Sequence, residues 1–249
     1  MKDFTLSMYE LLLINLQKNG YNFITFEDSI TNPHNGKQII LRHDVDKLPY
    51  NSLDTAKVEH KLGIKGVYYF RIVKESNDPK VIKEIAALGH EIGYHYEDMA
   101  LTKGNIDNAI HDFEKNLAYF RQFYPVRTIC MHGSPMSKWD NKKIWEKYNY
   151  KNYGIIGEPY FDINFDEFCY LTDTGRRWDG DKVSVRDKVK STFNLHFHST
   201  TDIINGISKL PNKIMITTHP QRWSNNQIIW IKELILQSIK NIVKRIIAS

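Results

Sequence analysis

The sequence contains only two cysteines, Cys130 and Cys169, which is too few for a fold held together by several disulfides. No uncharged apolar run approaches the ~20 residues that a membrane-spanning helix needs, which excludes an integral membrane protein. No Gly-x-Gly-x-x-Gly fingerprint follows an early strand and no Walker-type loop is present, which excludes the common nucleotide-binding folds. The low cysteine content and a start that does not resemble a secretory signal predict a cytoplasmic protein.

No Gly-, Ser- or Pro-rich linker divides the 249 residues, so we expect a single domain over residues 1–249. Hydrophobic residues make up 41% and charged residues 25%, as in ordinary globular proteins. The net charge is 34 − 29 = +5, and the cationic residues are scattered along the chain. Nucleic-acid-binding proteins usually cluster them on one face, so we expect no nucleic-acid partner.

Apolar runs typical of strands alternate with segments typical of amphipathic helices. The expected strands cover residues 22–26, 37–41, 67–73, 91–95, 127–131, 192–197 and 213–217. The expected helices cover residues 7–18, 53–62, 80–88, 105–123, 141–148, 202–209 and 226–247, and residues 150–189 are expected to be irregular. This alternation predicts an α/β protein with a parallel sheet, and six or seven such units can close into a barrel. An open, doubly wound sheet is the alternative.

Two carboxylates stand one residue apart at the end of the second expected strand, in Arg42-His43-Asp44-Val45-Asp46. They repel each other unless a cation neutralises them, and a divalent metal leaves the second carboxylate free to act as a base. The same Asp-x-Asp pattern also occurs in turns and helix caps. We favour the metal interpretation because barrels and open parallel sheets carry their chemistry at the carboxyl ends of the strands.

Three histidines, His95, His132 and His219, also stand where expected strands end. His95 closes the segment 89–95, Gly-His-Glu-Ile-Gly-Tyr-His, and alternation along the strand makes it a candidate imidazole ligand. A lone histidine in such a place is more often a core residue with satisfied hydrogen bonds. Together with the Asp-x-Asp pattern, however, the three histidines indicate one shared site.

A polar loop in the irregular middle of the chain contains Asp173, Arg176 and Trp178. Asp and Arg hydrogen-bond sugar hydroxyls, and Trp offers a flat face to a sugar ring, so these residues are candidates for substrate binding. Arg42 and Arg222, near the ends of other strands, are further candidates. A solvated turn with an Arg–Asp surface pair is the alternative.

Taken in order, these motifs resemble the polysaccharide deacetylase family (carbohydrate esterase family 4, with the NodB-like fold). Residues 89–95 are the most specific match, because that family usually has Gly-His-Glu-Ile-Gly-Asn-His there. The resemblance covers residues 37–223. It implies a distorted (β/α)7 barrel, a divalent metal that is usually zinc, and hydrolytic removal of an N- or O-acetyl group from a sugar.

The resemblance also implies roles for individual residues. Asp44 and Asp46 correspond to the family's Asp pair, one of them the general base and the other a metal ligand. We assign Asp44 as the base and Asp46 as the ligand, although the family's adjacent Asp-Asp-Gly differs from Asp44-Val45-Asp46 and leaves the choice open. His95 corresponds to the first metal-binding histidine, and His219 to the late general acid.

The family's second metal-binding histidine lies four residues after the first, where this chain has Met99, a poor ligand for zinc. We expect His132 to complete a site of three protein ligands, with Glu97 as the next candidate. The family's Arg-x-Pro-Pro-Tyr segment is also absent, and residues 131–134 stand in its place. The chain thus resembles a divergent branch associated with the biosynthesis of surface polysaccharides or O-antigen. The alternative is a non-catalytic carbohydrate-binding relative with a degenerate metal site.

The C-terminal segment 226–247 is expected to form an amphipathic helix. Its apolar residues follow helical spacing, and Lys232, Lys240, Lys244 and Arg245 lie on the other side. We expect the first half to close the barrel. The last two turns are both apolar and basic, which predicts contact with a membrane surface, at its inner face, or with a protein partner.

Overall fold

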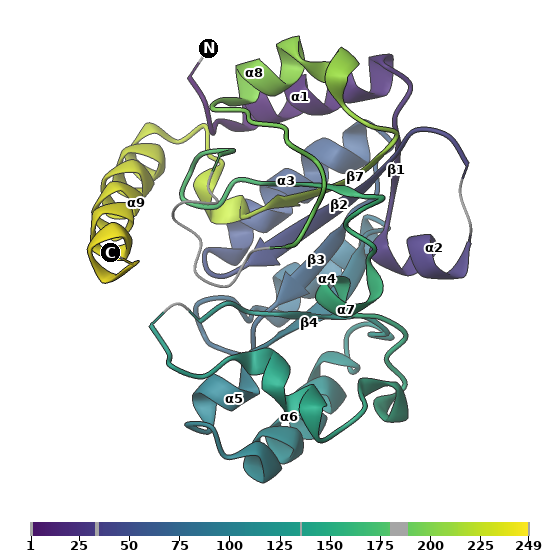
Figure 1. The fold of residues 1–249 in the computed structure, drawn as a ribbon, viewed down its shortest axis with the longest axis vertical. Helices are drawn as coiled ribbons and strands as arrows, with labels where there is room; N and C mark the ends of the chain where they lie inside the picture. The colour runs from purple at the N-terminus through teal and green to yellow at the C-terminus, as the bar shows by residue number, and fades with distance from the viewer. Residues whose placement is uncertain (1, 33–34, 135, 180–188, 249) are drawn as a thin grey trace.

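The computed structural model describes residues 2–32, 35–134, 136–179 and 189–248, and only the backbone of 243–248. Seven parallel strands form one sheet, with helices packed against it in two groups (Figure 1). The strands are β1 (Asn22–Ile24), β2 (Gln38–Val45), β3 (Val67–Phe70), β4 (Glu91–Tyr96), β5 (Ile129–Met131), β6 (Cys169–Thr172) and β7 (Lys213–Thr218). The expected α/β fold with a parallel sheet is confirmed.

The order of the strands is β5-β4-β3-β2-β7-β6, and β1 pairs with the first half of β2. The long strand β2 therefore lies at the centre, with β3 on one side and β7 on the other. Among the described residues no ladder joins β5 to β6, so these two strands form the edges. The sheet is an incomplete barrel, in agreement with the expected distorted (β/α)7 barrel.

The helices follow most of the expected segments, with shifted ends. They are α1 (Leu6–Lys18), α2 (Phe26–Thr31), α3 (Pro49–Lys61), α4 (Pro79–Ala87), α5 (Asp98–Leu101), α6 (Ile106–Phe120), α7 (Pro159–Asp162), α8 (Thr200–Asn205) and α9 (Gln227–Ala248). Short 3-10 helices are η1 (Asn141–Glu146), η2 (Tyr150–Tyr153), η4 (Ile207–Lys209) and η5 (Pro220–Arg222). Thr5 caps α1 by accepting a hydrogen bond from the backbone N–H of Met8, and Ser199 and Asp202 form a capping box on α8.

One expected strand was wrong. Residues 192–197 contain no strand, and the place beside β7 is taken by β6, from the segment that was expected to be irregular. The alternation of Phe193, Leu195 and Phe197 has another cause, because these side chains pack against the apolar cluster around α1, β2 and β7. Of the segment 150–189 that was expected to be irregular, residues 180–188 lie outside the described residues.

Alternation along the strands separates an outer apolar face from an inner face that carries polar groups. Arg42 and Asp44 of β2 lie on the inner side with His95 of β4, whereas His43 points outward to Glu59 of α3. Gly93 allows close packing on the inner side, because a Cβ there would lie 2.2 Å from the ring of Tyr69. The inner face thus has room for a compact polar cluster near the strand ends.

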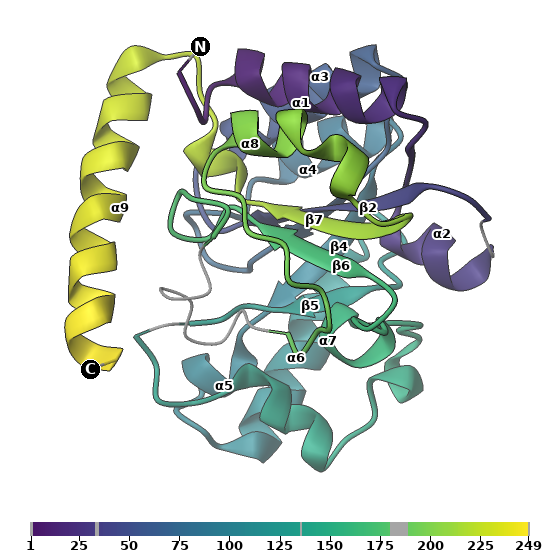
Figure 2. The same ribbon diagram turned by 45° about the horizontal axis from the view of Figure 1, so that its top comes forward.

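The C-terminal helix α9 does not close the barrel, contrary to the expectation for its first half. It lies along one side of the molecule, as the two ribbon views agree (Figures 1 and 2). Among the described residues no helix has the length and apolarity needed to cross a membrane.

Candidate active site and metal centre

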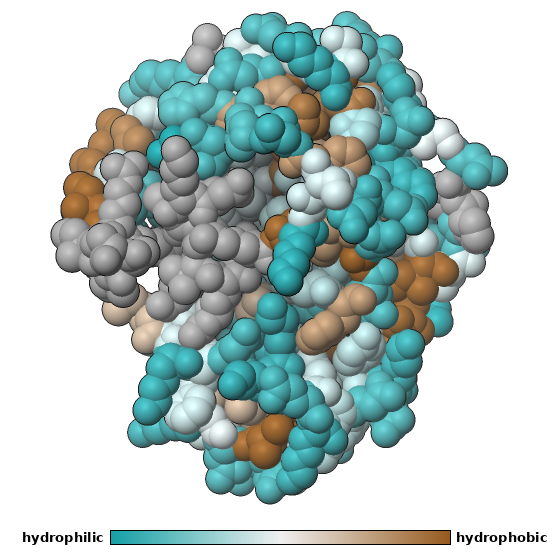
Figure 3. All heavy atoms as spheres, viewed as in Figure 1, coloured by the Kyte–Doolittle hydropathy of each residue, from teal (hydrophilic) through white to brown (hydrophobic). Residues whose placement is uncertain are grey.

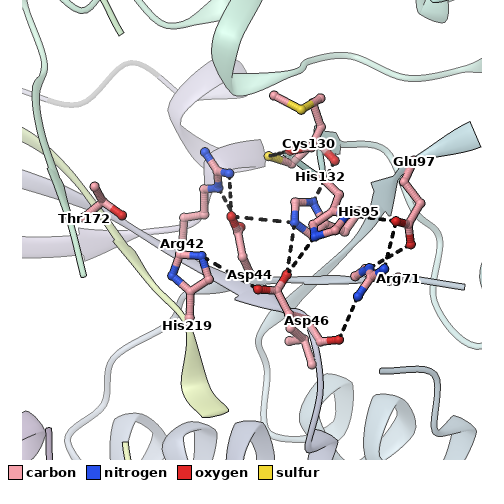
Figure 4. A network of polar contacts seen from close by, with 12 residues as sticks. Arg42, Asp44, Asp46, Arg71, His95, Glu97, Cys130, His132, Thr172 and His219 are labelled. Carbon is pink, nitrogen blue, oxygen red and sulfur yellow. Dashed lines mark hydrogen bonds and ion pairs between the residues drawn. The ribbon is translucent and has the colours of Figure 1, made fainter. Parts of the chain in front are cut away.

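Six of the seven strands are followed immediately by a polar or charged residue that enters one network (Figure 4). In chain order these residues are Asp46, Arg71, Glu97, His132, Asp173 and His219, after β2, β3, β4, β5, β6 and β7. Figure 4 labels all of them except Asp173, which contacts His219. Because parallel strands end at the same edge of a sheet, residues far apart in the sequence meet there. Asp46, His95, His132 and His219, expected to share a site at this edge, therefore lie in one cluster of titratable side chains.

Asp46, His95 and His132 present their ligand atoms to one another. Oδ1 of Asp46 lies 3.5 Å from Nε2 of His132 and 3.8 Å from Nε2 of His95. The three ligand atoms all lie within 4.8 Å of one another. Oδ1 of Asp46 is buried and has no hydrogen-bond partner in the part of the chain that the structure describes. A buried carboxylate oxygen of this kind is costly unless a cation or a donor compensates it.

The hydrogen bonds behind the two imidazoles orient them for a cation. Nδ1 of His95 lies 2.9 Å from the carbonyl oxygen of Cys130, and Nδ1 of His132 lies 2.9 Å from Oε2 of Glu97. Because a carbonyl or carboxylate oxygen only accepts, each Nδ1 carries the hydrogen and each Nε2 turns a lone pair toward Asp46. Metal-binding histidines show this arrangement, so the residues present fit a divalent cation.

Glu97 supports His132. Arg71 donates from Nε and Nη2 to the two oxygens of Glu97, at 2.7 and 2.8 Å, and from Nη1 to the carbonyl oxygen of Asp46 at 3.1 Å. Burial raises the pKa of Glu97, but the hydrogen bonds from His132 and Arg71 outweigh it and bring the pKa to about 2. Of the two candidates for the third ligand, His132 faces Asp46, whereas Glu97 holds His132 in place.

Neighbouring charges at Asp46 and burial at His95 keep both groups in the form that binds a cation. Burial raises the pKa of Asp46, but the charges of His132, His219, His95 and Arg71 lower it to well below its ordinary value. Burial lowers the pKa of His95 to about 4. At neutral pH the site therefore contains a carboxylate and a neutral imidazole.

Asp44 lies beside this cluster in a buried ion pair with Arg42. Nε and Nη2 of Arg42 donate to Oδ1 and Oδ2 of Asp44 at 2.8 and 2.7 Å, and Oδ2 lies 3.7 Å from Nε2 of His95. The sequence favours Arg42 as a substrate-binding residue. In the structure, however, Arg42 has no exposed surface and is not placed to contact a substrate. It orients the carboxylate of Asp44 instead.

His219 is held from behind by Asp173. Nδ1 of His219 lies 2.6 Å from Oδ1 of Asp173, which also accepts from Nη1 of Arg222 at 2.6 Å, while Trp223 donates to Oδ2 at 2.8 Å. Burial and the charge of Arg222 lower the pKa of His219. The charge and hydrogen bond of Asp173 and the charge of Asp46 raise it by more, so the pKa lies above its ordinary value. Asp173 and Arg222, expected to bind substrate, therefore serve to position His219.

Two further sequence candidates lie away from the cluster. Trp178 is only 5% exposed, and its indole N–H donates to Oγ1 of Thr200, so its ring has no face free for a sugar. Arg176 is buried against α9 and donates to the carbonyl oxygen of Trp230 at 2.8 Å. Met99 is 4% exposed and packs in the apolar core under α6, so its thioether takes no part in the site.

A groove of about 540 Å³ opens beside the cluster. Its lining residues are Arg71, Glu97, Ala100, Leu101, Lys103, His132, Ser134, Met136, Ser137, Lys138 and Trp139. The ring of Trp139 covers Gly104, where a Cβ would lie 2.6 Å from the indole. The groove thus joins His132 to a surface with an aromatic ring and two lysines.

Sequence reasoning missed the role of Arg71, and it assigned Asp173 a different one. The available signal was position, because Arg71 directly follows the apolar strand Val-Tyr-Tyr-Phe, as Asp46 and His132 follow theirs. The expected strand 67–73 runs past this position, so Arg71 is found only by a search for the first charged residue after the apolar run 67–70. Such a search finds Asp173 only when β6 is recognised.

No family model matches the chain, and no curated protein matches its sequence. Solved structures do show similarity. A family 4 carbohydrate esterase from Streptomyces lividans in complex with acetate is 16% identical, with a TM-score of 0.45, and the match covers 83% of this chain and 90% of that one.

Two further similar structures are a CE4 esterase from Streptococcus mutans and a CE4 family pseudoenzyme from Bacillus anthracis. The first is 16% identical over 92% of this chain and 90% of that one, with a TM-score of 0.49. The second is 14% identical over 82% of this chain and 60% of that one, with a TM-score of 0.48. Likeness at this level assigns neither an activity nor residue roles to this chain.

Proposed function

We propose that this protein is a metal-dependent carbohydrate deacetylase that hydrolyses the acetyl group of an acetylated sugar. The observation that carries the proposal is the site itself: two imidazole lone pairs and an uncompensated carboxylate oxygen converge at Asp46, His95 and His132. A second carboxylate, Asp44, and a histidine held by an aspartate, His219, lie on either side. This is a cation site flanked by a candidate base and a candidate acid.

Asp46, His95 and His132 would hold the divalent cation, and Zn²⁺ is the cation most suited to one oxygen and two imidazole ligands. When bound, the cation supplies Lewis-acid polarisation of the acetyl carbonyl group and lowers the pKa of water. The backbone carbonyl of Cys130 and the carboxylate of Glu97 keep the two imidazoles in the required tautomer.

The remaining residues move protons. Asp44 accepts the proton of the water that attacks the acetyl carbon, and Arg42 fixes the direction of its carboxylate. His219 donates a proton from Nε2 to the sugar nitrogen as the C–N bond breaks, while Asp173 retains the hydrogen bond to Nδ1. The products are acetate and an amino sugar, or an alcohol if the substrate is an O-acetyl ester.

The groove beside His132 would bind the rest of the carbohydrate. Lys103 and Lys138 offer donors to hydroxyl or anionic groups, and Trp139, whose ring lies between Gly104 and the Nζ of Lys138, forms part of the wall. We further propose that the substrate is a precursor of a surface polysaccharide in the cytoplasm. Cys130 and Cys169 are buried and are not joined in a disulfide, which suits such a reducing compartment.

The test is to strip the full-length protein with a chelator, restore Zn²⁺, and measure acetate released from acetylated sugar nucleotides, lipid-linked sugars and oligosaccharides. We expect release that requires the metal and is lost in Asp44→Asn. The proposal fails if the purified protein takes up no metal. A non-catalytic carbohydrate-binding protein with a degenerate site, the alternative from the sequence, would then be favoured.

A further inference from the structure

The exposed large apolar side chains of the described residues are concentrated in two places. Seven lie on α9: Ile228, Ile231, Leu234, Ile235, Leu236, Ile239 and Ile242. Four lie on segments that follow the strands of the candidate site: Leu48, Tyr50, Leu101 and Met136. Three lie elsewhere: Leu11, Ile30 and Phe161. The seven residues on α9 are called the α9 face below.

Helix α9 presents its polar side to the protein and its apolar side to the outside. Glu233 and Gln237 are 5% and 4% exposed, whereas Ile235 and Ile239 are 54% and 53% exposed. A surface helix of a globular protein normally has the opposite arrangement, with the apolar stripe on the core. The orientation of α9 therefore has no explanation in the packing of this chain, and large exposed apolar patches usually mark interaction sites.

The inward contacts of α9 are specific, and they fix it beside the candidate site. Oε2 of Glu233 pairs with Nζ of Lys47 at 2.6 Å, and Lys47 is the neighbour of Asp46. Nδ2 of Asn241 donates to the carbonyl oxygen of Gly175 at 2.9 Å, in the loop after β6. Because both loops follow carboxyl ends of strands, α9 lies at the same end of the sheet as the site. In Figure 3 its apolar side chains form a brown band at the edge of the molecule.

The width of the α9 face distinguishes between partners. Around the helix axis, Leu234 and Leu236 are the two outermost residues of the α9 face, and the other five lie between them. At 100° per residue, the arc from Leu234 through Ile235 to Leu236 is about 200°. The seam of a two-helix coiled coil is much narrower, and it follows a 3-4 heptad spacing. The spacing from Ile228 to Ile242 is 3-4-4-3, so a second copy of the helix would leave much of the arc uncovered. The acyl and headgroup boundary of a bilayer covers such an arc completely.

The charge of the helix agrees with a lipid surface. Its sequence contains four cationic residues, of which Lys232 and Lys240 are exposed; at 100° per residue Lys232 lies within the arc of the α9 face, which corrects its expected place on the other side, and Lys240 lies about 40° beyond Leu236. The one anionic residue, Glu233, is neutralised by Lys47. Cations beside an apolar face bind anionic headgroups, whereas two copies of α9 would bring like charges together.

From these contacts we infer that the α9 face binds the surface of an anionic phospholipid bilayer, and that the candidate site lies beside the lipid–water interface. The inference does not depend on the proposed deacetylase activity.

The test is co-sedimentation of the full-length protein with vesicles of phosphatidylcholine alone or mixed with phosphatidylglycerol. We expect binding to the mixed vesicles that weakens in high salt. In the triple variant Ile231→Gln, Ile235→Gln, Ile239→Gln we expect binding at least about tenfold weaker. The matched control Leu11→Gln, Ile30→Gln changes apolar residues that are 36% and 37% exposed, and it should bind as the parent protein does.

The inference is overturned if the parent protein binds neither kind of vesicle, or if the triple variant binds as well as the control. It is also overturned if sedimentation equilibrium without lipid shows a dimer that the triple variant converts to a monomer, because a second copy would then cover the α9 face. Vesicle binding is read without acetate release, so its failure is distinguishable from failure of the deacetylase proposal.

Discussion

His132 reaches the cation site because of the pairing between β4 and β5. Their register aligns His95 with Cys130 and Tyr96 with Met131, so the next residues, Glu97 and His132, emerge side by side. Met99 has already left the strand for α5 and lies in the core. The chain has no histidine four residues after His95, and the neighbouring strand supplies His132 as the proposed ligand in its place.

This geometry predicts the metal affinities of three alanine variants. His132→Ala and His95→Ala should each lower the affinity for Zn²⁺ by at least about tenfold, since each removes one of three ligands. Met99→Ala should leave the affinity nearly unchanged and instead lower the free energy of unfolding by about 2–4 kcal/mol, the cost of a cavity in the core. Isothermal titration with Zn²⁺ and urea unfolding measure the two effects.

Full metal occupancy in His132→Ala would contradict its role as a ligand, and Glu97 would be the next residue to test. Met99→Ala is the matched control, because it changes a neighbour of the site without removing a donor that faces Asp46.

The two aspartates of the second strand should behave differently. Asp46→Asn should lose the metal, because it weakens the one carboxylate that faces both imidazoles. Asp44→Asn should retain the metal and lose turnover by several orders of magnitude, because an amide cannot accept the proton. Metal content and acetate release separate the two outcomes. Equal loss of metal from both variants would make both residues ligands and place the base elsewhere.

At the scale of the elements, the sequence predicts long, buried strands better than short ones at the edge. The eight residues of β2 are all buried, and the apolar runs of β2, β4 and β7 led directly to Asp46, His95 and His219. Strand β6 has four residues and pairs only with β7 among the described strands, so its pattern is too short to recognise. Residues 192–197 have a clearer alternation, but their apolar side chains pack on a cluster that includes α1, β2 and β7 without joining the sheet.

The same limit explains which roles of side chains were wrong. Asp173, Arg176 and Trp178 are neighbours in the sequence, which favours one shared sugar-binding loop. In the structure Asp173 turns to His219, Arg176 to α9 and Trp178 to the core. These three side chains, within six residues of one another, point in different directions. Their directions depend on tertiary packing, which the residue types alone do not specify.

Helix α9 allows a prediction about truncation. Deleting residues 242–249 retains Glu233 and Asn241, the contacts that fix the helix, and it removes Ile242, which is 58% exposed. We expect the melting temperature to change by less than about 2 °C, because the contacts made by Glu233 and Asn241 are retained. Thermal unfolding followed by circular dichroism measures this. A much larger fall would show that the last turns stabilise the fold.

At the scale of the whole molecule, three buried carboxyl groups outside the cation cluster make stability depend on pH. Burial raises the pKa of Glu91, Asp98 and Glu158 to about 7 each, from ordinary values of 4.5 for Glu and 3.8 for Asp. The folded state therefore binds these protons more tightly than the unfolded state. Their contribution to stability is complete below about pH 4 and is lost as the pH rises through 7.

We expect the free energy of unfolding, measured in urea with a chelator present, to fall between pH 5 and pH 8. Asp98→Asn should reduce that fall by about 2–4 kcal/mol, since the amide does not titrate yet can still bond to Tyr94 and Asn116. Carboxyl groups with lowered pKa values, such as Glu97, lose their contribution only at lower pH, so they do not affect this window. An equal slope in the variant and the parent protein would contradict the role of Asp98.

The strand order also determines when each part of the site is completed during synthesis. Asp46, His95 and His132 follow or belong to β2, β4 and β5, which lie in one continuous half of the sheet and in the first 132 residues. Asp173 and His219 follow β6 and β7, and β6 has no partner among the described strands until β7 has been made. On the ribosome, the three proposed metal ligands therefore emerge before the residues proposed to protonate the leaving group. A growing chain therefore contains the complete set of proposed ligands well before it contains the complete candidate site.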